Sequence, residues 1–141
     1  MHHHHTQWAG TFALGAQLSR RHYSVAITLG NTPECDLLCI SPGGQSFKIE
    51  VKSTNSHNFI RIQKKLMENP VDNNLLLVVV LIPKDLTELE QFFILTHEEL
   101  RAAWENVPKT KKTGEPLVEG HEGINWGSVS DCENCWRKLP E

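Results

Sequence analysis

Hydrophobic and polar residues follow two periods along the chain, and together they predict a series of helices and strands. Apolar residues four positions apart predict helices over residues 8–21 and 59–67. Alternating or continuous apolar residues predict strands over residues 23–29, 36–40, 47–52, 74–82 and 92–95. Thr96 and Glu99 form a capping box, which predicts a further helix there and leaves His97 on its surface. This pattern predicts an α/β (α+β) domain.

The apolar run over residues 74–82 is rich in Leu and Val. Such runs are typical of strands that are buried on both faces, so we expect it to be the central strand of a mixed sheet. It is shorter than the roughly 18 apolar residues of a membrane span, and no apolar signal follows Met1. We therefore expect a cytoplasmic protein with no membrane partner.

A β-hairpin is predicted in the first half of the chain. Its turn is the segment Ser41-Pro-Gly-Gly-Gln, in which Pro fixes φ and Gly allows positive φ. In the strand that follows, apolar residues alternate with charged ones, so Glu50 and Lys52 share one face. A turn centred on Gly43 places Asp36 directly opposite Glu50.

Two like charges directly opposite each other in a sheet are destabilising, so this pair of acids needs an explanation. A divalent cation between Asp36 and Glu50 would offset the repulsion. Mg²⁺ prefers oxygen ligands and usually takes one or two carboxylates with water and phosphate. Lys52 would reach whatever the metal holds. The hairpin is therefore a candidate metal site.

An acid at a strand start, a hairpin, and then Glu-x-Lys resembles the PD-(D/E)XK nuclease superfamily. Here these residues are Asp36 and Glu50-Val51-Lys52. The surrounding sequence is similar to small Holliday-junction-resolvase-like and restriction-endonuclease-like members, in the segments Leu18-Ser-Arg-Arg, Leu29-Gly-Asn-Thr-Pro, Asp36-Leu-Leu and Ile49-Glu-Val-Lys. The resemblance implies a restriction-endonuclease-like core with a central mixed sheet of four to five strands, flanked by helices.

The resemblance also implies a chemistry for these residues. Asp36, Glu50 and the backbone carbonyl of Val51 would hold Mg²⁺ or Mn²⁺, and Lys52 would orient the attacking water or neutralise developing charge. The implied activity is endonucleolytic hydrolysis of nucleic acid, with DNA the favoured substrate, leaving a 5′-phosphate. Many such modules form homodimers, so a homodimer is a further expectation.

One position departs from the pattern of the superfamily. Related members often carry a glutamate after a glycine near the start of the first helix, and that glutamate joins the metal site. Here Thr11 follows Gly10 at this position, and Gln17 is the next polar residue on the helix. Neither supplies a negative charge. The alternative function is therefore a weakened nuclease fold that binds nucleic acid or a partner protein without cleaving.

The net charge of −3 excludes binding of nucleic acid through overall basicity, so local contacts must suffice. Polar and basic candidates flank the motif, although a solvated surface explains many of them equally well. They are Arg20, Arg21, Ser53, Asn55, Arg61, Lys64 and Lys65.

The chain of 141 residues is long enough for one core, and its composition changes towards the C-terminus. We expect a tag or disordered segment over residues 1–7, a nuclease-like core over 8–106, and a loop-rich extension over 107–141, packed on the core by Trp126 and Trp136. Cys132 and Cys135 form a single CxxC, which is half of a zinc site, and reduced thiols are the favoured alternative.

Overall fold

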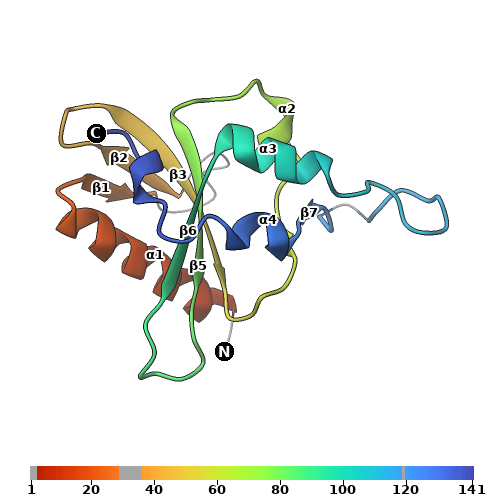
Figure 1. Cartoon of the computed structure of the whole chain (residues 1–141), viewed down its shortest axis with the longest axis horizontal. Helices are drawn as coiled ribbons and strands as arrows, with labels where there is room; N and C mark the ends of the chain where they lie inside the picture. The colour runs from red at the N-terminus through yellow and green to blue at the C-terminus, as the bar shows by residue number, and fades with distance from the viewer. Residues whose placement is uncertain (1–2, 29–35, 119) are drawn as a thin grey trace.

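The computed structural model describes residues 3–28, 36–118 and 120–141 of the chain (Figure 1). The expected turn over residues 30–33 lies outside them. The described elements are, in order, α1 (His3–Arg20), β1 (Ser24–Ile27), β2 (Leu37–Ile40), β3 (Ser46–Thr54), β4 (Ile60–Arg61), α2 (Lys65–Glu68), β5 (Leu75–Leu81), β6 (Gln91–Thr96), α3 (His97–Glu105), β7 (Gly123–Ile124), α4 (Trp126–Ser130) and the 3-10 helix η1 (Trp136–Lys138).

A mixed sheet of five strands, in the order β1-β2-β3-β5-β6, is the centre of the fold. The strands β3 and β5 are parallel, whereas the other neighbours are antiparallel. Every residue of β5 is buried, which confirms the prediction of a strand covered on both faces. A separate small sheet pairs β4 with β7. The predicted class, an α+β domain with a mixed central sheet between helices, is confirmed.

Separate hydrophobic cores lie on the two faces of the sheet. The first core packs α1 against one face, with Leu14 and Leu18 among its buried side chains. The second core packs α3, α4 and the small sheet against the other face, with Leu100 and Trp104 at its centre. This second cover lies over β5 and β6 (Figure 1). On β2 the same face carries Leu38 and Ile40, each 48% exposed.

Two elements differ from the prediction because tertiary contacts determine them. The helix α1 begins at His3 rather than at residue 8, since Thr6 is buried in the fold. The segment 59–67 is not one helix: Ile60 and Arg61 form β4, and only α2 remains helical. The partner strand β7 lies some sixty residues later in the chain, beyond the reach of any local pattern.

Two tryptophans of the C-terminal segment contact aromatic side chains of β6. Trp126 contacts the ring of Phe93 edge-on at 5.0 Å between centroids. The ring centroids of Trp136 and Phe92 are 5.5 Å apart, and the guanidinium carbon of Arg21 lies over the Trp136 ring, 3.9 Å from its centroid. No helix among the described residues is both long and apolar enough to span a membrane.

His97 is buried, and the expectation of a surface residue was therefore wrong. Its Nδ1 accepts a hydrogen bond from the Asp72 backbone N–H at 2.8 Å, and its Nε2 lies 2.8 Å from the Leu66 carbonyl. The ring connects the start of α3 to the segment between α2 and β5. The sequence shows only its place in the capping box, so this tertiary role has no local signal.

Candidate functional site

The hairpin has the predicted register. Leu37 faces Ile49 and Leu38 faces Lys48, so the next step along the strands sets Asp36 against Glu50. In the parallel pairing with β5, Glu50 lies beside Leu77, whose side chain belongs to the second core. The charged face of β3 therefore lies on the same side of the sheet as α3. It lies at the boundary where the elements of the second core cease to cover the sheet.

Asp36 closes the end of the β2–β3 ladder. Its carboxylate Oδ2 accepts a hydrogen bond from the Val51 N–H at 2.8 Å, and its own N–H donates to the Ile49 carbonyl at 3.0 Å. The N–H and C=O of a strand residue are directed to the same neighbour, so the Val51 carbonyl is also directed to the side of Asp36. The two backbone groups and the carboxylate thus meet beyond the first residue of β2.

Glu50 and Lys52 form a half-buried ion pair on β3. The Lys52 Nζ lies 3.6 Å from Glu50 Oε1, and the two side chains are 27% and 13% exposed respectively. Burial raises the pKa of Glu50 above its ordinary value, and the nearby charge of Asp36 raises it further, while Lys52 lowers it. The effects of burial and of Asp36 on the pKa of Glu50 are together larger than the opposite effect of Lys52. The site therefore holds a carboxylate whose negative charge lacks full compensation.

The start of α1 approaches the site closely because Gly10 leaves room. A Cβ at Gly10 would lie 1.9 Å from the hydroxyl of Ser53 on β3, so only glycine permits this contact. Asp36 and Thr11 line one cavity of about 160 Å³ between α1 and the sheet. Thr11 is buried, and its hydroxyl donates to the Gln7 carbonyl at 3.0 Å. Gln17, the other candidate position, hydrogen bonds Arg21 instead.

Gln7 is a site residue that the sequence analysis missed. It lines the cavity of Asp36 and also a second, polar cavity of about 470 Å³ beside Lys52. The second cavity is lined mainly by neutral side chains, which include Thr6, Ser53, Thr54, Asn55, Ser56 and Asn58. The helical spacing of Gln7 and Thr11, one turn apart, was the available signal, but the segment was expected to precede the helix.

The structure brings some of the predicted polar residues to the site and leaves others elsewhere. Ser53 and Asn55 line the cavity beside Lys52. Arg21 lies at the far end of α1, about 20 Å from Gln7 at 1.5 Å per residue, and its side chain is held by Gln17 and Trp136. Arg20 ends the same helix and is exposed.

The remaining predicted basic residues lie outside both cavities. Arg61 is exposed on β4, and Lys64 precedes α2. Lys65 lines a different cavity, with Asp72 and His97. Gln7 lines two cavities, and neither of them is lined by Arg61, Lys64 or Lys65.

The oxygen donors at the site suit a hard divalent cation. Two carboxylates and a carbonyl, with water and phosphate, form the kind of ligand set that Mg²⁺ uses. A bound cation would stabilise the charged form of Glu50 and so lower the pKa that burial and Asp36 raise. Within residues 3–28, 36–118 and 120–141, no group of three or more His, Cys, Asp or Glu side chains adds to this ligand set. Cys132 packs in the second core, whereas Cys135 packs against the first. With the other described residues, the two thiols form no group of three or more potential metal ligands.

Comparison with known proteins bears on the fold. No protein-family model and no curated protein sequence matches the chain. Among solved structures, the chain is similar to that of a bacterial homing endonuclease, I-Ssp6803I, with a TM-score of 0.52 and 15% sequence identity. The match covers 94% of this chain and 86% of that chain. At this identity the likeness is one of fold: the chain has a fold similar to that of a homing endonuclease.

Proposed function

We propose that the chain is a metal-dependent endonuclease that hydrolyses phosphodiester bonds of nucleic acid, with DNA the favoured substrate. The observation that carries the proposal is the meeting of Asp36, Glu50 and Lys52, with burial raising the pKa of Glu50 and with cavities lined by Asp36 and by Lys52 on either side. The fold similarity to a homing endonuclease supports it. Membership of the PD-(D/E)XK superfamily remains a prediction from the motif.

Asp36, Glu50 and the Val51 carbonyl would hold Mg²⁺ or Mn²⁺. When bound, such a cation polarises a phosphoryl oxygen and lowers the pKa of water. Lys52 is 3.6 Å from Glu50, so its ammonium would lie beside the scissile phosphate and stabilise the charge that develops there. Asp36 is held in place by the Val51 N–H, which orients its carboxylate before any ligand arrives.

The neutral cavity beside Lys52 would bind the sugar and phosphate groups that flank the cleaved bond. Hydroxyl and amide groups such as those of Ser53 and Asn55 donate to phosphate oxygens without adding charge. Such contacts position a strand but do not read its sequence. We therefore expect cleavage that depends on the shape of the substrate more than on base identity.

The test is cleavage of labelled duplex, single-stranded and branched DNA, with RNA alongside, in Mg²⁺ and in Mn²⁺. The parent chain would be compared with Asp36→Asn, which keeps an acceptor for the Val51 N–H, and with Lys52→Ala. The matched control is Lys48→Ala, because Lys48 lies on the same face of the same strand and forms an ion pair with Asp72 rather than with the site. We expect loss of roughly a hundredfold or more in both site variants and little change in the control.

Folded parent protein that cleaves none of these substrates in either metal would overturn the proposal. Equal loss in Lys48→Ala would also contradict it, because the effect would then follow from general charge rather than from the site.

The second candidate function is binding of nucleic acid without cleavage, and Thr11 favours it. Thr11 is neutral, and its hydroxyl is already donated to Gln7. Thr11→Glu would place a third carboxylate in the cavity of Asp36. If the parent chain binds but does not cleave, we expect this variant to bind Mn²⁺ more tightly by calorimetry, with Thr11→Gln as the uncharged control.

A further inference from the structure

The outer edge of the sheet is an unpaired strand. Within the described residues, β1 is hydrogen bonded to β2 on one side and to no strand on the other. The Thr28 N–H donates to Asp36 on the β2 side, so by alternation the backbone groups of Ser24 and Ala26 also point to β2. Those of Val25 and Ile27 therefore point outwards, where a further strand could pair with them.

Within Ser24–Ile27, the edge strand has no charged residue, proline or bulge that would prevent pairing. Charged residues, proline and bulges keep exposed edge strands apart in many proteins. The sequence of β1 is Ser-Val-Ala-Ile, with no charge and no proline, and its pairing with β2 is regular over all four residues. The edge is therefore open to another strand.

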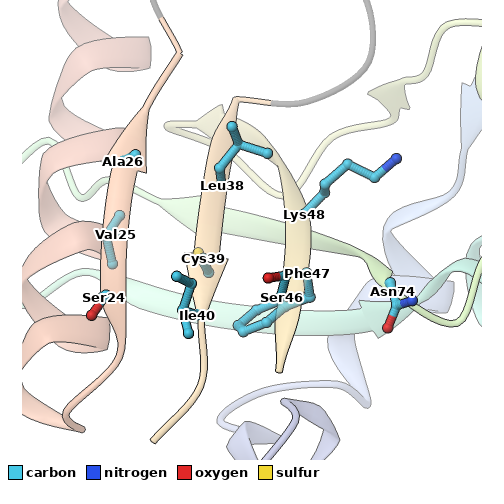
Figure 2. Close-up of a pocket in the computed structure, with 10 residues that line it drawn as sticks. All are labelled: Ser24, Val25, Ala26, Leu38, Cys39, Ile40, Ser46, Phe47, Lys48 and Asn74. Carbon is cyan, nitrogen blue, oxygen red and sulfur yellow. The ribbon is translucent and has the colours of Figure 1, made fainter. Parts of the chain in front are cut away.

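Exposed apolar side chains flank the edge on both faces of the sheet, and we name this set the β1 edge patch. On the α1 face it contains Trp8 and Phe12, which stack at 5.3 Å and are 42% and 60% exposed, together with Ile27. On the opposite face it contains Leu38 and Ile40, which line a shallow cavity of about 510 Å³ (Figure 2). The five side chains of the patch are apolar, and one charged side chain, that of Lys48, lines the cavity beside Leu38. An occupant that is itself mainly apolar fits the patch best.

A second copy of this chain meets these requirements, because the strand is complementary to itself. In an antiparallel pairing centred on Ala26, Val25 of each copy faces Ile27 of the other, and their free N–H and C=O groups form hydrogen bonds. The two Ala26 residues then face each other as the close, non-hydrogen-bonded pair, with Cα atoms about 4.5 Å apart, where a small side chain is needed. The arrangement is isologous, as in most dimers.

We propose that two copies of the chain pair through β1 to form one continuous sheet, with the β1 edge patch as the interface. The twofold axis is normal to the sheet at Ala26, so Asp36 and Glu50 of both copies lie on the same side. Two sites on one side suit a substrate with two strands. The interface itself does not depend on the proposed nuclease function.

The first experiment is the mass of the metal-free chain, without nucleic acid, by sedimentation equilibrium over a range of concentrations and salt. We expect twice the monomer mass of 16.0 kDa, with little dependence on salt because the patch is uncharged. Ile27→Lys and Phe12→Glu are each expected to give monomers. Leu86→Lys, at a fully exposed loop position far along the sequence, is the matched control and should stay dimeric.

The second experiment tests the register. Ala26→Cys should form a disulfide between copies under mild oxidation, because the paired Cα atoms lie within the range of 4.4–6.8 Å. Ser24→Cys should not form this disulfide, because in the proposed register Ser24 of each copy faces Thr28 of the other copy. The parent chain, oxidised in the same way, shows whether its native cysteines cross-link the copies by themselves.

A parent chain that is monomeric at every concentration would overturn the proposal, and so would a dimer that survives both Ile27→Lys and Phe12→Glu. A dimer in which Ser24→Cys cross-links and Ala26→Cys does not would overturn the register. None of these outcomes depends on cleavage, so a failure here is distinct from a failure of the proposed function.

Discussion

The inner and outer halves of the central sheet differ in how they are covered. Along β5 and β6, helices and the small sheet cover one face and α1 with its neighbours covers the other, so every residue of β5 is buried. Along β2, burial alternates strictly, because only the α1 face is covered. The strand β3 lies between these halves, and it carries Glu50 and Lys52 on the face where the cover ends.

This difference explains why the charged residues lie where they do. A carboxylate on the covered face of β5 would be fully desolvated, which is very unfavourable. On β1 or β2 it would be solvated and would keep an ordinary pKa. At the boundary, Glu50 is buried enough for its pKa to rise, yet its ion-pair partner Lys52 lines a cavity that a ligand can enter. The boundary of the cover therefore combines an unusual charge with access.

The largest effect on stability is expected when a side chain in the inner half of the sheet is shortened. Leu77 on β5 is 1% exposed and belongs to the second core, whereas Leu38 on β2 is 48% exposed. We expect Leu77→Ala to lower the free energy of unfolding by about 2–5 kcal/mol, because it creates a cavity. Leu38→Ala, the same chemical change, should cost about 0.5 kcal/mol or less. Urea titration measures both, and equal losses would contradict the contrast between the halves.

A smaller effect is expected where the cover is attached to the sheet. His97→Ala removes the acceptor of the part-buried Asp72 N–H and the group that contacts the buried Leu66 carbonyl, leaving both backbone groups without these partners. We expect a loss of roughly 1–3 kcal/mol in urea titration. His121→Ala is the control, because His121 is exposed and should change little. A loss in His97→Ala no larger than in the control would show that the connection contributes nothing.

The third effect has the opposite sign. Glu50→Gln removes the carboxylate charge that burial and Asp36 disfavour, so the metal-free protein should become more stable. Added Mg²⁺ should raise the thermal midpoint of the parent chain but not that of the variant, because a ligand stabilises only the form that binds it. If Glu50→Gln is less stable than the parent, the ion pair with Lys52 contributes more than burial costs.

The sequence predicted the hairpin register and the pair of acids, because a turn and an alternating strand are local features. It also predicted β5, whose apolar run needs no partner to be recognised. Three features could not be predicted, because each depends on residues far apart in the chain. They are the pairing of β4 with β7, the burial of His97, and the approach of Gln7 to Ser53, for which Gly10 makes room.

The smallest effect is a change of stability with pH that Glu50 alone should cause. Its pKa is higher in the folded chain than in the unfolded chain, so the folded state binds the proton more tightly. The contribution of protonated Glu50 to stability is therefore complete below the unfolded pKa and is lost as pH rises through the folded pKa. The difference in unfolding free energy between Glu50→Gln and the metal-free parent should accordingly grow from acidic to neutral pH. Urea titrations of both proteins across that range measure it, and a constant difference would show that the charge of Glu50 is already compensated by Lys52 at the boundary.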